Sequence, residues 1–260
     1  DPITRSATIA SGEADVVIVA DAATLPVLNN NPDIELIKSN AGYYLELWMM
    51  VDTPPFDDVR VRKALKLVQD RQAIVDLAFF GFGFPMNDHP IRPDSSQSYS
   101  SEIIPQDIAQ AKALLAEAGQ SDLTVDLYTG ATELIPGLNA FVQAYKEMAA
   151  EAGITINIVA APSASYYEEV SHKQPFGASY WFYRPNALIW PFYMKSSTWN
   201  EQRWMRDDFD ALIEKAFGTV DPDARLELYK EAQRIISEEG GLVSPAFSSV
   251  VSAVRKGCHY

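Results

Sequence analysis

The chain has 260 residues and a formal net charge of −14 at pH 7; 47% of its residues are hydrophobic and 22% are charged. This composition is typical of a globular protein with a real core, so it excludes a disordered chain. An acidic chain lacks the cationic surface that displaces counterions from phosphates, so we expect no nucleic-acid partner. The sequence has no apolar run of the ~18 residues that span a bilayer. Its one cysteine, Cys258, cannot form an internal disulfide.

The first eighty residues predict strands followed by helices. Asp57 or Asp58 can cap a helix, and Asp70 can cap a second short helix that would end at Gly81. Three apolar or β-branched runs before them are suited to strands, at 14–20, 34–39 and 43–51.

The middle of the chain alternates between helix and strand. An amphipathic helix at 107–119 precedes a strand at 123–129, a helix at 136–153 and a strand at 154–160. Strand, helix and strand with short links form a βαβ unit, which implies a parallel pair of strands. The remaining residues predict a helix, an aromatic strand, two helices and a final strand, at about 163–173, 180–183, 206–218, 221–241 and 241–254. We therefore predict an α/β fold throughout.

Residues 180–190, YWFYRPNALIW, place five aromatic side chains around one cation, Arg184. The alternating rings suit a strand that is buried on both faces. Two interpretations of the arginine stay open at this point. It can pair with a structural carboxylate such as Glu201 or Asp208 at the end of the strand, since arginine is rarely buried unpaired. Alternatively, the arginine and the rings line a ligand pocket.

The sequence contains no motif for catalysis or metal binding. GFGF at 81–84 begins like a dinucleotide loop, but Met86 holds the position of the third glycine. His89, His172 and His259 lie far apart without a carboxylate at ligand spacing, which favours surface or internally satisfied histidines over metal ligands. No nucleophile and base can be assembled, so we expect neither an enzyme nor a cofactor.

The segment PPFDDVRVRKALKLVQDRQAIV (54–75) resembles the family 5 extracellular solute-binding proteins, the periplasmic components of peptide and nickel ABC importers. The asparagine that usually precedes this segment in the family is Asp52 here. The resemblance covers nearly the whole chain, because further matches follow in the family's order at SGEADVV (11–17), DIAQAKALLAEAG (107–119) and DPDARLELYKEAQRIISEEGGLVSPAF (221–247).

The fold that this resemblance implies is a type II-like periplasmic binding protein, in which two α/β lobes close on a ligand about two crossing strands. By resemblance, residues 1–41 would be a remnant of the first lobe and 42–50 a hinge crossing. Residues 51–240 would be the second lobe, a mixed or parallel sheet with flanking helices, and 241–260 the return crossing and a truncated tail. Because the sequence lacks an initiator methionine and ends abruptly, we expect an excised piece of a longer periplasmic protein, in which a missing signal peptide carries no meaning.

The resemblance also places the end of the aromatic strand in the cleft, where ligands gather in open α/β sheets. Many peptide-binding members carry an aspartate just after the aromatic residue, and this sequence has Arg184 there instead. The planar fork of arginine fits carboxylate or phosphate oxygens, and the neighbouring rings can stack on a ligand. We therefore predict a ligand site made by Arg184, Tyr183, Trp181, Trp190, Asn186, Tyr44 and Trp199.

We interpret the sequence as the substrate-binding component of an ABC importer. It would capture a small organic solute, a peptide or a related compound that can bear a carboxylate, by lobe closure and deliver it to a permease in the inner membrane. Two alternatives stay open. One is an α/β interaction domain without a small ligand, and the other is a hydrolase on the same fold, which would need a nucleophile and a base within hydrogen-bonding reach.

Overall fold

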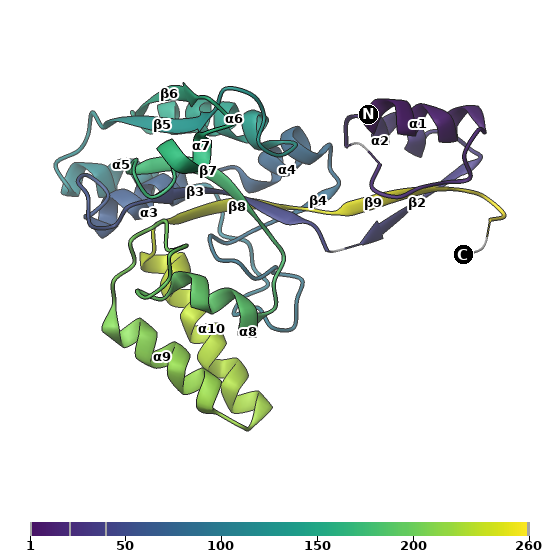
Figure 1. The fold of residues 1–260 in the computed structure, drawn as a ribbon. Helices are drawn as coiled ribbons and strands as arrows, with labels where there is room; N and C mark the ends of the chain where they lie inside the picture. Colours follow the sequence, from purple (N-terminus) through teal and green to yellow (C-terminus); the bar gives the residue numbers. More distant parts are fainter. Residues whose placement is uncertain (1, 21, 40, 259–260) are drawn as a thin grey trace.

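Two β-sheets joined by two neighbouring connections form the framework of the protein (Figure 1). The computed structural model describes residues 2–20, 22–39 and 41–258. The larger sheet has six strands in the order β4-β8-β3-β7-β5-β6, and the smaller has three in the order β1-β9-β2. Parallel and antiparallel pairs occur together in the larger sheet, and helices flank it. The predicted α/β fold with a mixed sheet is therefore confirmed.

The larger sheet contains the predicted βαβ unit. Its β5 and β6 run parallel, from Thr124 opposite Thr155 to Gly130 opposite Ala161. At the centre of the sheet, β3 pairs antiparallel with β7 on one side and with β8 on the other. The six strands are β3 (Tyr43–Met49), β4 (Gly83–Pro85), β5 (Thr124–Gly130), β6 (Thr155–Ala161), β7 (Phe176–Phe182) and β8 (Leu242–Ser248).

Aspartates begin four of the helices that cover this sheet, as the sequence predicts. The side chains of Asp58, Asp70, Asp107 and Asp221 each accept a hydrogen bond from a backbone N–H group in the first turn of the helix that follows. The helices are α3 (Val59–Leu67), α4 (Arg71–Phe79), α5 (Ile108–Glu117), α6 (Leu138–Glu151), α7 (Tyr166–Glu169), α8 (Asn186–Ile189), α9 (Asp207–Gly218) and α10 (Pro222–Glu239). None of the helices in the described parts of the chain is long and apolar enough to cross a membrane.

Side chains on the two faces of β3 pack into different hydrophobic clusters. Leu45, Leu47 and Met49 pack into the main core, together with residues of α3, α4 and α6. Trp48 belongs to a separate cluster with Tyr166 of α7. A further apolar cluster joins α9 and α10 (Figure 1), so the helices at the bottom of the view have a core of their own.

The smaller sheet corrects two expectations. It contains β1 (Val16–Val17), β2 (Ile34–Ser39) and β9 (Val250–Arg255), and α1 (Pro2–Ser11) and α2 (Leu25–Asn29) flank it. The buried strand predicted at 14–20 is wrong, because only two residues pair with β9 and Ile18 is 71% exposed. The single strand predicted at 241–254 is also wrong, because Ser249 separates β8 from β9, which belong to different sheets.

Other elements differ from the sequence prediction in extent. The helix expected at 163–173 is reduced to the single turn α7, and the sequence signals did not reveal α1 or β4.

The connections between the sheets run close together: a Cβ atom on Gly42 would meet the backbone oxygen of Ser248 at 2.2 Å. Glycine therefore permits the close approach of the two chain segments that link the sheets.

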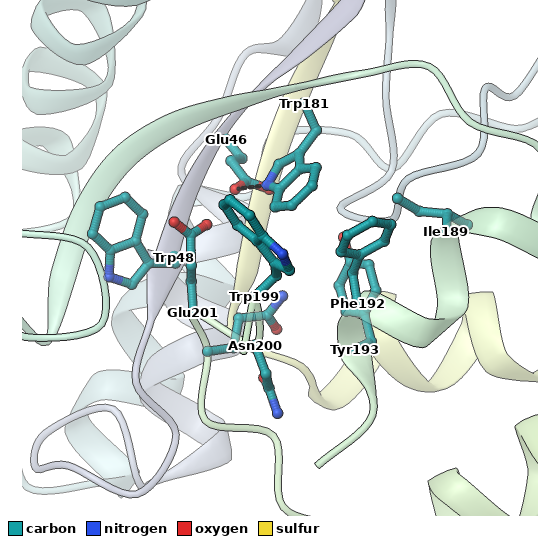
Figure 2. A pocket seen from close by; sticks show the side chains of 10 residues that line it. Glu46, Trp48, Trp181, Ile189, Phe192, Tyr193, Trp199, Asn200 and Glu201 are labelled. Carbon is teal, nitrogen blue, oxygen red and sulfur yellow. Dashed lines mark hydrogen bonds between the residues drawn. The ribbon is translucent and has the colours of Figure 1, made fainter. Parts of the chain in front are cut away.

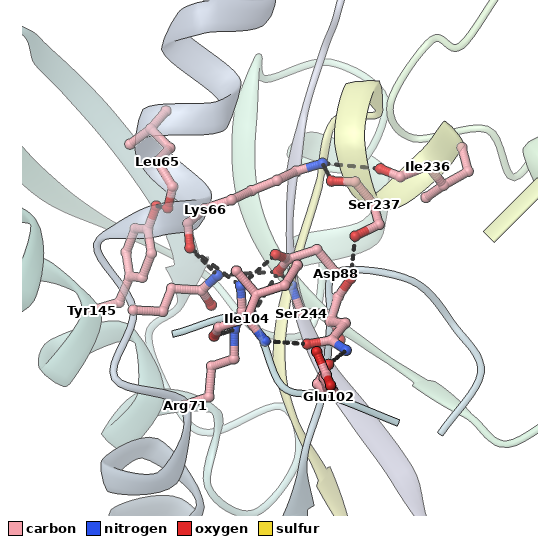
Figure 3. A network of polar contacts seen from close by, with 12 residues as sticks. Leu65, Lys66, Arg71, Asp88, Glu102, Ile104, Tyr145, Ile236, Ser237 and Ser244 are labelled. Carbon is pink, nitrogen blue, oxygen red and sulfur yellow. Dashed lines mark hydrogen bonds and ion pairs between the residues drawn. The ribbon is translucent and has the colours of Figure 1, made fainter. Parts of the chain in front are cut away.

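A buried polar network fastens β8 to α3, α4 and α10 (Figure 3). The Asp88 carboxylate accepts hydrogen bonds from Arg71 Nη2 at 2.6 Å and from the backbone N–H of Ser244 at 2.8 Å. Both members of the Arg71–Asp88 ion pair are buried. Nearby, Lys66 Nζ donates to the carbonyl oxygen of Ser237 at 2.8 Å. These contacts tie the last turn of α10 and the start of β8 to the helices on the sheet.

Replacing Asp88 tests how much this network stabilises the fold. We expect Asp88→Asn to lower the free energy of unfolding by about 3–5 kcal/mol, because the buried Arg71 charge loses its counter-charge. Urea denaturation followed by circular dichroism measures the loss. The matched control is Glu227→Gln, which removes the exposed partner of Lys230 and should change stability far less. Equal effects of the two substitutions would contradict this account of the network.

Candidate ligand-binding site

A hollow of about 620 Å³ lies at the C-terminal end of β7. The strand supplies part of its wall, and α7, the 3₁₀ helix η2 (Trp190–Tyr193) and the loop that follows η2 also contribute. Of the seven residues that the sequence predicts for a ligand site, three line this hollow: Trp181, Arg184 and Trp199. Tyr167, Phe192 and Glu201 line it as well, and the sequence prediction did not include them.

Arg184 is the second residue after β7, and its guanidinium group lies over two aromatic rings. The guanidinium carbon is 5.1 Å from the ring centre of Trp181 and 5.0 Å from that of Phe192. Such contacts hold a cation through the negative face of the ring. One donor of the group, Nη1, bonds to the carbonyl oxygen of Phe182 at 3.2 Å. The aromatic residues therefore hold the arginine in place at the wall of the hollow.

Neither carboxylate that could have paired with Arg184 does so. Asp208 forms an ion pair with Arg206, and Glu201 accepts a hydrogen bond from Ser171 Oγ at 2.7 Å. Among the described residues, Arg184 forms no ion pair within 4.0 Å. The arrangement supports the pocket interpretation of residues 180–190.

Close to Trp181 lie two buried carboxyl groups, those of Glu46 and Glu201 (Figure 2). Trp181 Nε1 donates to Glu46 Oε1 at 2.9 Å, and the charges of the two carboxyl groups act on each other. Glu46 is 3% exposed and Glu201 is 6% exposed. Burial, and then the charge of Glu201, raises the pKa of Glu46 well above its usual value, and burial also raises the pKa of Glu201. Two carboxyl groups removed from water disfavour each other's ionisation, which is the physical cause of the raised pKa of Glu46.

The sequence contained a signal for one member of this pair. Glu46 stands alone within the apolar run YYLELWMM, and a charged residue inside a buried strand is costly unless it has a partner or a role. Glu201 carries no comparable signal, because its segment, TWNEQRW, is polar and irregular. Only the folded chain shows that the two side chains meet.

Two of the predicted site residues are interior rather than lining residues. Trp190 is fully buried in the cluster that α9 and α10 share, and its Nε1 donates to Asn186 Oδ1 at 3.0 Å. Asn186 is 3% exposed and also donates to Gln97 Oε1 at 3.1 Å. Both side chains therefore hold the segment after β7 in place, and neither lines the hollow.

Tyr44 and Tyr183 lie beside the hollow rather than in its lining. Tyr44 is fully buried, and its hydroxyl oxygen is 3.4 Å from that of Tyr193. The Tyr183 ring packs against Phe247, with ring centres 6.2 Å apart, and is 37% exposed. The expectation of a strand buried on both faces is wrong at this end, because Phe182 is 54% exposed and the main core does not extend past it.

Within residues 2–20, 22–39 and 41–258, no group of three or more His, Cys, Asp or Glu side chains could hold a metal ion. His89 is completely buried, and the loss of water lowers its pKa to about 3. The carbonyl oxygen of His172 accepts a hydrogen bond from Arg203 at 3.0 Å. The third histidine, His259, lies outside the described residues.

The family model for bacterial extracellular solute-binding proteins, family 5, matches residues 1–231. The chain belongs to this family. Heme-binding protein A of Haemophilus influenzae is 27% identical over 261 residues, which cover 95% of this chain and 47% of that protein. Di/tripeptide-binding protein 1 of Pseudomonas aeruginosa is 27% identical over 271 residues, which cover 100% of this chain and 50% of that protein.

The fold of this family 5 chain is also similar to solved structures. HbpA2 from Haemophilus parasuis superposes with a TM-score of 0.83 at 23% identity, over 98% of this chain and 52% of that one. The type II-like periplasmic binding protein fold inferred from the resemblance is thereby confirmed. The chain spans about half the length of the curated relatives that it matches.

The raised pKa of Glu46 predicts a specific dependence of stability on pH. A carboxyl group whose folded pKa lies above the unfolded value near 4.5 stabilises the fold below that value, and the contribution is lost as pH rises through the folded pKa. Glutamine does not ionise, so the Glu46→Gln protein should not lose this contribution to stability as the pH rises. We expect the substitution to raise the free energy of unfolding at pH 8, because the amide needs no ionisation in the buried position.

The gain should be much smaller at pH 5, where the wild-type carboxyl group is already protonated. Chemical denaturation at both pH values measures the difference. Glu151→Gln, at the exposed end of α6, is the control and should have the same small effect at both. A Glu46→Gln protein whose stability differs from that of the wild type by the same amount at both pH values would contradict this prediction, because ionisation of Glu46 would then have no effect on stability.

Proposed function

We propose that this chain forms part of the substrate-binding component of an ABC importer and captures a small organic solute that bears a carboxylate, a peptide or a related compound. The observation that carries the proposal is Arg184, a cation held by Trp181 and Phe192 at the wall of a hollow and without an ion pair among the described residues. Membership of family 5 supports it. The name of the Pseudomonas aeruginosa relative, a di/tripeptide-binding protein, points to the same class of solute.

The geometry of the arginine suits a carboxylate. Its N–H donors lie in the plane of the guanidinium group, whereas aromatic rings attract its flat faces. Contacts with Trp181 and Phe192 therefore leave in-plane donors for the two oxygens of a carboxylate, which arginine can bind in bidentate fashion.

Capture in this proposal works by closure and needs no cofactor. Residues 1–41 would belong to a first lobe and 51–240 to a second, with 42–50 and 241–260 as the connections about which they move. A ligand drives closure only to the extent that it binds the closed form more tightly than the open form. The protein would work in the periplasm and pass the solute to an ABC permease in the inner membrane. The relatives described above are binding proteins, which supports a non-catalytic role.

Substitution of Arg184 tests the proposal. Binding of a panel of di- and tripeptides to the purified protein is measured by isothermal titration calorimetry, with each peptide as free acid and as C-terminal amide. We expect the free acids to bind more tightly than the amides. Arg184→Ala should weaken the binding of the free acids by about 2–5 kcal/mol if the charge pair is desolvated. The thermal midpoint should change little, because no internal carboxylate loses a partner.

The matched control is Arg234→Ala on α10, which removes an exposed arginine that pairs with Glu231 and Glu238. Its affinity for the free acids should equal that of the wild type. Two results would overturn the proposed role of Arg184. One is equal binding of acids and amides, and the other is an Arg184→Ala protein with a lowered thermal midpoint and unchanged affinity.

A further inference from the structure

A second pocket, of about 230 Å³, lies between the two sheets, and we call it the intersheet pocket. The smaller sheet and its helices contribute Arg5, Leu25 and Val251 to its wall, and the larger sheet and its helices contribute Tyr43 and Phe79. Helices α1 and α2 lie on the same side of the strands as α4 (Figure 1). The pocket shares no lining residue with the hollow at the end of β7.

Two neighbouring tyrosines of β3 separate the intersheet pocket from the candidate ligand-binding site. Successive residues of a strand point to opposite faces of the sheet. Tyr43 lines the pocket, where its ring centre is 5.8 Å from that of Phe79 and its hydroxyl group donates to the carbonyl oxygen of Pro136 at 2.7 Å. Tyr44 lies opposite Trp181, which lines the hollow. The two spaces are therefore distinct.

The lining of the intersheet pocket is mostly apolar. Ten of its thirteen described lining residues are apolar or aromatic, and the exceptions are Arg5, Ser248 and Ser249. An apolar cavity holds water poorly, and in another protein an apolar cavity of about 150 Å³ stays dry and binds benzene. The intersheet pocket is larger, so it has room for a small molecule with an apolar ring or a short chain.

Arg5 gives this apolar pocket a positive charge at one side. The residue lies on α1, is exposed, and takes part in no ion pair within the described parts of the chain. None of the described residues that line the pocket is acidic. The guanidinium group of arginine fits a carboxylate in bidentate geometry. Charge complementarity therefore favours an occupant with an anionic end.

The wall of the pocket near β1 has an unusual backbone conformation. Val19 has a φ of 58°, in the left-handed region that β-branched residues rarely adopt. The next residue, Ala20, donates its backbone N–H to the carbonyl oxygen of Val251 at 2.7 Å. Such a conformation persists only where the surrounding structure imposes it. The contact with β9 therefore shapes this part of the wall.

We propose that the intersheet pocket binds a small molecule with an apolar body and a carboxylate, such as an aromatic acid or a medium-chain fatty acid. The body would lie among Leu25, Phe79 and Val251, and the carboxylate would bind Arg5. The occupant would contact both sheets, so it would bind most tightly to one relative placement of them. This site is independent of the solute proposed for the hollow.

Calorimetry with 1-naphthoate and its neutral counterpart 1-naphthalenemethanol tests the site. Both probes carry the same ring system, so the comparison isolates the charge. We expect the carboxylate to bind about two- to fivefold more tightly, which is the effect of an ion pair open to water. Arg5→Gln should remove this preference and leave binding of the alcohol unchanged. Lys112→Gln, which removes an exposed charge on α5 outside the pocket lining, should keep the preference.

Substitutions that fill the pocket test where the ring system lies. Ala22→Phe, and independently Val250→Phe, should weaken the binding of both probes at least about tenfold, because each adds a ring to the lining. Ala116→Phe adds the same ring to the exposed face of α5 and should leave binding unchanged. The thermal midpoint of each variant shows whether it folds, and the Arg5→Gln comparison decides the case if neither filling variant does.

Arg184→Ala distinguishes the intersheet pocket from the hollow, and this variant should bind 1-naphthoate as the wild type does. Loss of 1-naphthoate binding in Arg184→Ala but not in the filling variants would overturn the inference, because the probe would then occupy the hollow. Equal affinity of the wild type for both probes would overturn the role of Arg5, and no binding of either would overturn the site. Peptide titrations test the proposed function separately, so either idea can fail alone.

Discussion

The burial of β3 determines the chemistry of the candidate site. The strand is buried from Tyr44 to Met49 because β7 and β8 cover its two edges and packed side chains cover its faces. Any polar group in its middle is therefore removed from water by the sheet itself. Glu46 occupies such a position, so its raised pKa follows from the architecture. A glutamate on a surface loop beside a second carboxyl group would stay ionised, because water would solvate its charge.

The register between β3 and β7 then places the acid beside the cation. Tyr44 lies opposite Trp181, and Glu46 lies opposite Ser179, two residues earlier on β7. Residues two apart on a strand point to the same face, so the Trp181 indole lies diagonally next to Glu46 and can donate to it. Arg184 follows at the end of the strand and stacks on the same indole. One tryptophan thus contacts both charged groups, and a one-residue slip in register would separate them.

The sequence predicts local features of this protein well and contacts between distant segments poorly. Helix caps such as Asp70 and Asp107 and the βαβ unit were predictable, because they depend on signals a few residues apart. The pocket wall at Trp181 and Arg184 was predictable from the unusual density of rings around one cation. Trp190 belongs to the same aromatic stretch of sequence, yet it is fully buried. After Arg184 the chain enters α8 and η2, and these elements carry Trp190 into the interior. The pattern of apolar residues along the sequence could not show that residues 14–20 are partly exposed to solvent. It also could not show that Glu46 and Glu201, which are far apart in the sequence, lie close together in the fold.

The two charged groups differ in what they can contribute to recognition. Arg184 lies at the wall of the hollow, where water screens its attraction for an anion, so its contribution depends on how fully a bound solute excludes water. The carboxyl groups of Glu46 and Glu201, in contrast, are buried in the structure without a ligand. A buried polar site rejects a ligand that lacks its partner group strongly, because the site's own groups are then left unpaired, whereas a hydrophobic wall rejects an altered ligand only weakly. In the proposed site, Arg184 would therefore attract anionic solutes in general.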